Sequence, residues 1–185
     1  MLVKPSILDT TLAAATQDRQ TVSPEGKPLR RLTEGVMIRE LPTHVDDCGS
    51  VVELYDPRWQ WHPDPFVFAY AFTIRPGYVK GWNLHKVHED RYCLLYGEMD
   101  LVLYDPRPDS KTYGEVCTIS LNAYDRRIVN VPRYVWHADH NIGTTDVVIV
   151  NFPTTQYDHT NPDKYRLPID TDLIPFKFPP GARGY

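Results

Sequence analysis

The sequence has few cysteines and no basic cluster. Cys48, Cys93 and Cys117 are the only three among 185 residues, and they lie far apart. An odd and scattered set provides neither a disulfide framework nor the paired spacing of a zinc ribbon. The formal net charge is −4, and no group of Lys and Arg stands out. We therefore expect no nucleic-acid partner, because the basic field that such proteins present is missing.

Long apolar runs are also missing. No stretch approaches the roughly 18 consecutive apolar residues that cross a bilayer. The first residues lack the basic-then-apolar order of a signal peptide. We expect a cytoplasmic protein without a membrane partner.

Proline and aromatic residues are plentiful. The 17 prolines and 10 glycines are spread along the chain, a pattern that suits short strands joined by turns better than long helices. With 42% hydrophobic residues, 185 residues are enough for one packed domain. We expect one mainly β domain at 35–178, after an N-terminal arm at 1–34 and before an extended C-terminal tail at 179–185.

Short apolar runs bounded by turn residues predict the strands of a sandwich or barrel. The predicted strands are 35–41, 51–55, 66–74, 91–96, 99–104, 115–121, 128–131 and 146–152. A short helix is predicted within 7–15.

Two polar segments stand among these strands. Gly77, Asn83, His85, Asp90 and Gly97 follow the spacing G-x5-N-x-H-x4-D-x6-G. Alternate residues of an extended strand share one face, so Asn83 and His85 point the same way. A second segment follows the spacing P-x-Y-x2-H-x3-N. Its fixed positions are Pro132, Tyr134, His137 and Asn141.

Asn83, His85, Asp90 and His137 are thus predicted to converge on one point. Two imidazoles and a carboxylate are credible ligands for Zn²⁺, Fe²⁺ or Mn²⁺. The same set is equally credible without a metal, as a histidine base oriented by a carboxylate. Hydrogen-bonded barrel-interior histidines without a chemical role are the remaining interpretation.

The spacing resembles the two motifs of the cupin superfamily, G-x5-H-x-H-x3or4-E-x6-G and P-x-G-x2-H-x3-N. Asn83, Asp90 and Tyr134 replace a His, a Glu and a Gly of these motifs. Cupins are small barrels of antiparallel strands. The resemblance implies an all-β fold, a cupin-type double-stranded β-helix (jelly-roll barrel) in which these positions point inward.

A closer resemblance involves residues 80–85, 97–114 and 131–137. They are similar to the dTDP-4-dehydrorhamnose 3,5-epimerase family, which shows R-G-L-H, then G-x-x-x-D-V-x-V-D-x-R-x-x-S-P-T-x-G, then I-P-x-G-F-A-H. Residues 46–53 are similar to its D-x-R-G-x-F-x-E segment.

The resemblance implies proton abstraction next to the C4 ketone of a nucleotide-linked 4-keto-6-deoxy sugar. His85 occupies the family's base position, and His137 matches its second, substrate-facing histidine. From the motif spacing we expect His85 to act as the base, with Asp90 or His137 assisting. Glu53 corresponds to a substrate-contacting residue that is often contributed across a homodimer.

Some positions depart from the family. Asp90 and Arg91 stand where the family has its enolate-stabilising Lys, which makes Arg91 the nearest cation for the substrate. Asn151 falls at the position of the family's acidic Tyr. Lys80 is a candidate contact to a diphosphate, and Asn83 and Asn151 are candidate substrate-binding residues.

We therefore expect an epimerase or keto-isomerase that needs no cofactor and acts on a nucleotide sugar. One alternative is a metal-dependent cupin, an oxygenase or isomerase on a small carbonyl substrate, with one Zn, Fe or Mn bound by His85, Asp90 and His137. Another is a cupin that binds a sugar nucleotide without turning it over.

Overall fold

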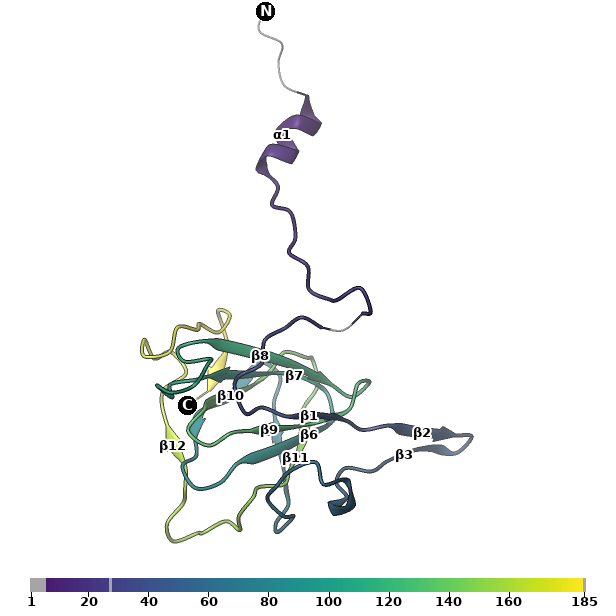
Figure 1. Ribbon diagram of the computed structural model, residues 1–185, viewed down its shortest axis with the longest axis vertical. Helices are drawn as coiled ribbons and strands as arrows, with labels where there is room; N and C mark the ends of the chain where they lie inside the picture. Colours follow the sequence, from purple (N-terminus) through teal and green to yellow (C-terminus); the bar gives the residue numbers. More distant parts are fainter. Residues whose placement is uncertain (1–5, 27, 185) are drawn as a thin grey trace, which may run out of the picture. The chain divides into compact units, whose positions relative to one another are not determined.

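The computed structural model describes residues 6–26 and 28–184, and the chain divides into two units, Met1–Arg31 and Leu32–Tyr185 (Figure 1). The first unit contains α1 (Ile7–Ala14), within the predicted range. A capping box starts this helix: the Ser6 hydroxyl accepts a hydrogen bond from the Asp9 amide, and the Asp9 carboxylate accepts one from the Ser6 amide. None of its side chains is buried, so capping rather than packing stabilises it.

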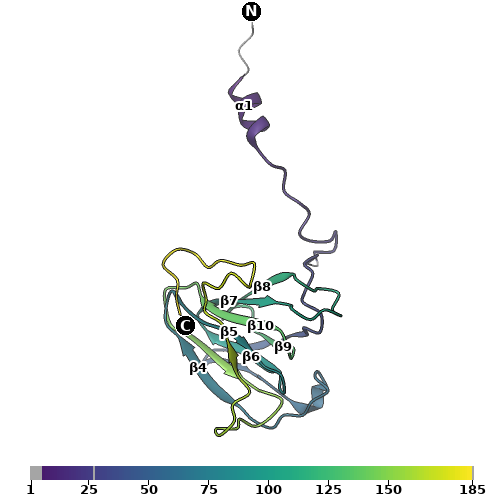
Figure 2. The same cartoon turned by 90° about the vertical axis from the view of Figure 1, so that its left-hand side faces the viewer.

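The second unit consists of two facing sheets, which Figure 2 shows as two layers. The first sheet has the order β1 (Ile38–Glu40), β9 (Arg127–Val131), β6 (Asp90–Tyr96), β11 (Val147–Asn151), β4 (Tyr70–Ile74). The second has the order β12 (Tyr165–Arg166), β5 (Tyr78–Leu84), β10 (Trp136–Asn141), β7 (Glu98–Tyr104), β8 (Val116–Asn122). Pairing is antiparallel, except that β13 (Arg183–Gly184) runs parallel to β5. The expected all-β double-sheet architecture is confirmed.

A hairpin and one short helix complete the unit. Among the residues that the structure describes, β2 (Thr43–Asp46) and β3 (Gly49–Val52) pair with each other and with no other strand. The segment η1 (Pro57–Trp59) is a 3-10 turn. In the part of the chain that the structure describes, no helix combines the length and the apolar character needed to span a membrane.

Several strand boundaries differ from the sequence-based expectation. The strand predicted at 66–74 begins only at Tyr70, and the one at 35–41 begins only at Ile38. The strand predicted at 51–55 ends at Val52. Apolar residues next to these strands, such as Val36, pack on the core without pairing to another strand. Because the prediction relied on apolar patterning, it included such residues and made the strands too long.

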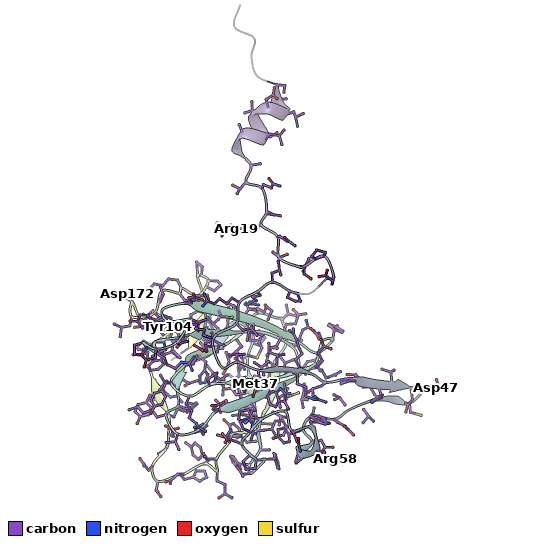
Figure 3. All side chains as sticks on the ribbon, in the orientation of Figure 1. Arg19, Met37, Asp47, Arg58, Tyr104 and Asp172 are labelled. Atoms are coloured by element: carbon purple, nitrogen blue, oxygen red, sulfur yellow. The ribbon has the colours of Figure 1, made fainter. Side chains whose placement is uncertain are left out.

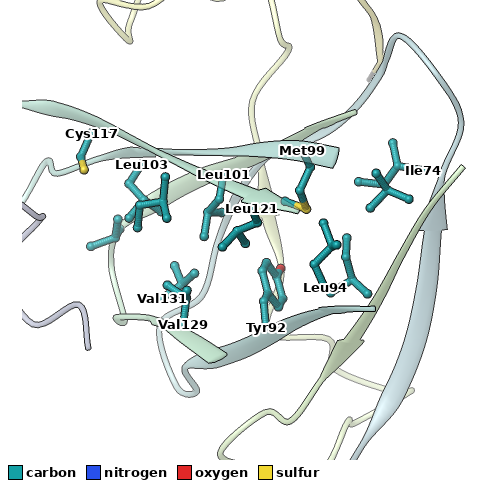
Figure 4. Packing of buried hydrophobic residues seen from close by; sticks show 14 residues of the cluster. Ile74, Tyr92, Leu94, Met99, Leu101, Leu103, Cys117, Leu121, Val129 and Val131 are labelled. Atoms are coloured by element: carbon teal, nitrogen blue, oxygen red, sulfur yellow. The ribbon is translucent and has the colours of Figure 1, made fainter. Parts of the chain in front are cut away.

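The core lies between the two sheets (Figure 4). On β7, Met99, Leu101 and Leu103 alternate inward and are fully buried, and β8 contributes Ile119 and Leu121. Each such side chain stabilises the fold by about 1.5–3 kcal/mol. This core holds the two sheets together. The polar residues Asn83 of β5, Asp90 of β6 and His137 of β10 lie next to it.

The C-terminal segment packs on the outer face of β5. The Trp82 ring is fully buried and contacts the rings of Phe176 and Phe178, with centroids 6.0 and 5.6 Å apart. This packing brings residues 162–167 alongside the end of β5, where β12 pairs with Leu84 and Asn83.

Gly81 lies on β5 directly against the backbone of β10. A Cβ at this position would lie 2.6 Å from the Ala138 Cα and 2.8 Å from the His137 carbonyl oxygen. We expect Gly81→Ala to lower the free energy of unfolding by about 1–3 kcal/mol through overpacking, measured by denaturant unfolding. Gly143→Ala is the control, because a Cβ there meets only ordinary contacts at 3.5 Å; equal losses in the two variants would contradict this account.

Candidate active site

A cavity of about 160 Å³ opens inside the barrel. Both sheets and the C-terminal segment supply its lining, which consists of Tyr70, Phe72, Lys80, Asn83, His85, Asp90, Tyr92, Asp139 and Lys164. The predicted convergence of Asn83, His85 and Asp90 is thus what the structure shows.

The Asp90 carboxylate is the centre of this cluster. It is 1% exposed, and its Oδ2 lies 3.2 Å from His85 Nε2 and accepts a hydrogen bond of 2.9 Å from the Tyr92 hydroxyl. Its Oδ1 accepts a hydrogen bond of 2.6 Å from Asn151 Nδ2. Burial raises the pKa of Asp90, but the bonds from His85 and His88 outweigh it and hold the pKa well below the ordinary value. Asp90 is therefore an anion.

Both ring nitrogens of His85 face an oxygen atom. Nδ1 contacts the Asp163 backbone carbonyl, and Nε2 faces Asp90. Burial lowers the pKa of His85, yet the hydrogen bond and charge of Asp90 outweigh this and keep the pKa above its ordinary value. The ring is thus held in one orientation as a strengthened base, the role that a proton-abstracting histidine requires.

Asp163 fixes the turn that follows β5. Its carboxylate accepts hydrogen bonds from the amides of Lys86, Val87 and His88, at 2.9, 2.8 and 3.2 Å, and lies 3.0 Å from His88 Nδ1. No pattern in the sequence pointed to Asp163 and Lys164, because they lie in an irregular segment far from His85 along the chain.

His137 lies opposite Asn83 in the pairing of β10 with β5. It is fully buried, and its Nε2 is 3.5 Å from Asp90 Oδ2. Burial and the neighbouring His85 lower the pKa of His137 to about 3. His137 is therefore neutral at pH 7, whereas His85, whose pKa is raised, is readily protonated. Of the two rings, His85 is the stronger base.

Asp139 is a second buried carboxyl group in the cavity. It is 1% exposed, and its Oδ1 has no hydrogen-bond partner among the described residues. Burial and the charge of Asp90 raise the pKa of Asp139 to about 8. At pH 7 this side chain is mainly a neutral acid.

The raised pKa of Asp139 predicts a pH-dependent cost in stability. The folded state holds the proton more tightly than the unfolded state does, so stability falls as pH rises from about 4 to about 8. Asp139→Asn is neutral at every pH and should melt several degrees above the parent at pH 8, with no difference near pH 4. Melting curves across this range test it, and a constant offset at all pH values would contradict the assigned cause.

His85, His88 and Asp90 form a group whose potential ligand atoms lie within 4.8 Å of one another. Two imidazoles and one carboxylate suit a divalent transition metal, although the sequence predicted His137 in place of His88. The Asp90 oxygens, however, already receive hydrogen bonds from Tyr92 and Asn151. Each Asp90 oxygen thus has a hydrogen-bond donor among the described residues, and the same group could also hold an ion.

The predicted substrate-binding residues have different surroundings. Lys80 lines the cavity with its Nζ 5.5 Å from the centre of the Phe72 ring, and Asn83 Oδ1 lacks a hydrogen-bond partner among the described residues. Asn151 is not among the residues that line the cavity. Its side-chain amide donates hydrogen bonds to Asp90 Oδ1 and to the Tyr70 hydroxyl. Asn151 thus positions cavity groups instead of lining the cavity.

The expectation that Arg91 is a cation for the substrate needs correction. Arg91 is fully buried outside the cavity lining. Its guanidinium donates to the carbonyls of four residues and to the Tyr55 hydroxyl; the four are Asp64, Pro65, Phe152 and Pro153. Arg91 ties two loops to the barrel, because β6 alternation turns it away from Asp90.

Glu53 is exposed and follows β3. Its hairpin extends beyond the barrel, as the label of Asp47 at the tip shows in Figure 3. Glu53 is absent from the lining of the cavity in its own chain. Its contribution across a homodimer stays a prediction.

A larger groove of about 760 Å³ adjoins the cavity. The two spaces share Tyr70, His85 and Lys164. The outer groove adds cationic and aromatic side chains, among them Lys86, Tyr157, His159, Tyr165 and Arg166. A small polar chamber thus opens into a groove able to hold a longer, negatively charged ligand.

Sequence comparisons reveal related proteins, although no family model matches the chain. The probable low-salt glycan biosynthesis epimerase Agl13 of Haloferax volcanii is 32% identical over 137 residues, covering 73% of this chain and 87% of that protein. The spore coat polysaccharide biosynthesis protein SpsL of Bacillus subtilis is 30% identical over 149 residues, covering 80% and 97%.

Solved structures share the fold. A dTDP sugar isomerase from Desulfovibrio desulfuricans G20 has a TM-score of 0.73 at 24% identity, covering 80% of this chain and 94% of that one. The dTDP-6-deoxy-D-glucose-3,5-epimerase RmlC from Legionella pneumophila, in complex with dTDP-4-keto-L-rhamnose, has a TM-score of 0.70 at 17% identity, covering 81% and 82%. Together with the relatives, they confirm the cupin fold and the resemblance found in the sequence: the chain belongs to the RmlC-like family of dTDP-sugar epimerases and isomerases, the dTDP-4-dehydrorhamnose 3,5-epimerase family.

Proposed function

We propose that this protein epimerises, or keto-isomerises, a nucleotide-linked 4-keto-6-deoxy sugar by removing a proton next to the C4 ketone. The observation that carries this proposal is the His85–Asp90 pair, with Nε2 and Oδ2 3.2 Å apart, in a chamber that opens into a larger groove. A proton next to a ketone is weakly acidic, so its removal needs both a positioned base and a group that stabilises the enolate.

The cavity contains groups for each part of this chemistry. Neutral His85 keeps its proton on Nδ1, which donates to the Asp163 carbonyl, so the electron pair on Nε2 is free to take the proton. The Asp90 anion beside Nε2 stabilises the imidazolium that results. The electron pair moves onto the C4 oxygen. Lys80 and Lys164 bring positive charge to the same chamber and are suited to stabilise that oxygen. The two lysines thus take the role first considered for Arg91.

The outer groove suits the nucleotide. Lys86 and Arg166 carry the charge that pairs with a diphosphate, and Tyr157 and Tyr165 offer aromatic faces for a base. The names of the two relatives place them in glycan and spore coat polysaccharide biosynthesis. We therefore infer an activated sugar for a polysaccharide or glycan as the substrate class, bound by a homodimer in which Glu53 reaches the partner's site.

Turnover of a substrate panel tests this function. The protein is incubated with 4-keto-6-deoxy sugars linked to dTDP, UDP or GDP, and products are identified by NMR. A new stereoisomer or keto isomer from at least one of them is the expected result. Thermal stabilisation by a sugar nucleotide with no product from any would instead identify a binding protein.

A metal-dependent reaction is the second candidate, because His85, His88 and Asp90 lie close enough to share an ion. A bound Zn, Fe or Mn would act there as a Lewis acid on a substrate carbonyl. Elemental analysis of protein purified without added metal, with activity measured before and after chelation, separates the candidates. About one metal per chain together with activity lost on chelation would favour the metal-dependent reaction.

A further inference from the structure

Tyr70 lies where the inner cavity joins the outer groove. Its side chain, at the start of β4, lines both spaces together with His85 and Lys164. Tyr70 is 39% exposed, so a ligand in the groove can reach its ring. A substrate that passes from the groove into the chamber has to lie against these three residues.

Two tyrosine hydroxyls belong to the residues that line the cavity, and their hydrogen bonds differ in direction. The Tyr92 hydroxyl donates its proton to Asp90 Oδ2 at 2.9 Å and is committed to that carboxylate. The Tyr70 oxygen instead accepts a hydrogen bond of 2.9 Å from Asn151 Nδ2. Because its oxygen serves as the acceptor there, the Tyr70 proton remains available to a ligand.

The pairing of β4 with β11 fixes the Tyr70 hydroxyl in this position. Tyr70 and Asn151 are direct cross-strand partners, and the same Asn151 amide also holds Asp90 Oδ1 at 2.6 Å. Asn151 therefore links the hydroxyl of Tyr70 to the carboxylate that orients His85. The hydroxyl and the base belong to one network but approach the cavity from different sheets.

We propose that Tyr70 is the general acid that returns a proton to the substrate carbon on the face opposite His85. This inference rests on the proposed function. His85 Nε2 first takes the proton from the carbon, and the electron pair moves onto the C4 oxygen as an enolate. When the C4 carbonyl re-forms, the carbon–carbon double bond takes the proton from Tyr70 Oη, leaving a phenolate and an imidazolium. The imidazolium proton then returns to the phenolate through water, which restores both residues.

The surroundings of Tyr70 suit a donor that is briefly ionised. Burial and the charge of Asp90 raise the pKa of Tyr70, so the hydroxyl keeps its proton until the enolate forms. The Asn151 amide, which already donates to the Tyr70 oxygen, would stabilise the phenolate, and the Lys164 ammonium lies at the same junction. Each of these contacts becomes stronger once the oxygen is negative.

Deuterium incorporation tests this role by separating proton removal from inversion. The parent and Tyr70→Phe are incubated in D₂O with the 4-keto sugar nucleotide that the parent converts, and exchange and inversion are followed by NMR. We expect Tyr70→Phe to keep exchange at the carbon within about 10-fold and to lose inversion by about 10²- to 10⁴-fold. Exchange would then proceed with retention, because His85 returns the label to the face from which it took the proton.

Two further variants keep this test decisive. Tyr96→Phe is the matched control, because Tyr96 is exposed on β6 outside both cavities, and it should behave as the parent does. Replacing Tyr70 with 3-fluorotyrosine keeps a hydroxyl on a ring of nearly the same shape and should keep inversion.

Parent-like inversion in Tyr70→Phe would overturn the assignment. Equal losses of exchange and inversion in Tyr70→Phe protein that melts normally would also overturn it. If the parent itself neither exchanges nor inverts any substrate, the proposed function fails, and the role of Tyr70 fails with it.

Discussion

His85→Asn should abolish both deuterium exchange and product formation, with a loss of about 10³-fold or more in turnover. His85 combines the position and the basicity that proton removal needs: it lines the chamber, its Nδ1 contacts the Asp163 carbonyl, and Asp90 raises its pKa. An amide in its place is not basic. Single-turnover NMR in D₂O measures the loss directly.

His44→Asn is the control for this prediction, since His44 is exposed on the hairpin strand β2. Circular dichroism and melting curves show whether His85→Asn folds, because the substitution also removes two contacts in the core of the site. A folded His85→Asn protein that exchanges deuterium at the parent rate would exclude His85 as the base.

Asp90→Asn should lower kcat/KM by about 10²- to 10³-fold and move the acidic limb of its pH profile to lower pH. In the parent, the base must be neutral, so kcat/KM falls as pH falls through the pKa of His85, which lies above the ordinary value of 6.5. The Asp90 anion causes that rise, so its removal lowers the pKa of His85 and keeps the ring neutral to lower pH. Rate profiles between pH 5 and pH 9 measure both effects.

The stability of Asp90→Asn as a function of pH independently tests the charge of Asp90. The pKa of Asp90 in the folded state is held well below 3.8, so its contribution to stability is present above that pH and is lost as pH falls through the folded pKa. Asp90→Asn should therefore lose stability at neutral pH and show less acid sensitivity than the parent. Asp125→Asn, which removes a surface ion pair with Arg127 at 2.9 Å, is the control with a small effect. An unchanged pH profile in Asp90→Asn would contradict the coupling between Asp90 and His85.

The convergence of Asn83, His85, Asp90 and His137 could be predicted because it depends on local geometry. Strand alternation places Asn83 and His85 on one face, and the motif spacing places Asp90 at the start of the next strand. The structure brings His137 opposite Asn83 across β5 and β10. The two-residue alternation is visible in one sequence, whereas His137 was identified by the spacing of its own motif, P-x-Y-x2-H-x3-N.

Contributions from distant segments could not be predicted in this way. Asp163 and Lys164 reach the site only because the aromatic tail packs on Trp82 and carries their segment past the end of β5. Arg91 looked like a free cation, yet backbone carbonyls of two loops enclose its guanidinium. Tertiary packing decides both cases, and no local pattern encodes it.

Tyr134 shows how a departure from a motif has a structural meaning. It stands where the cupin motif has a glycine, and its backbone φ is +62°, in the left-handed region that favours glycine. Its amide donates a hydrogen bond of 2.8 Å to the His85 carbonyl, which fixes the turn before β10 next to the base. The backbone conformation of the motif is thus kept although the residue differs.

The most direct test of the account is the position of deuterium in a 4-keto sugar nucleotide incubated with chelator-treated protein in D₂O. NMR should show incorporation at a carbon next to the C4 ketone, with the new stereoisomer forming at the same carbon and no loss of rate from chelation. A nucleotide sugar that binds the protein tightly but gains no deuterium at either neighbouring carbon would contradict proton abstraction by His85.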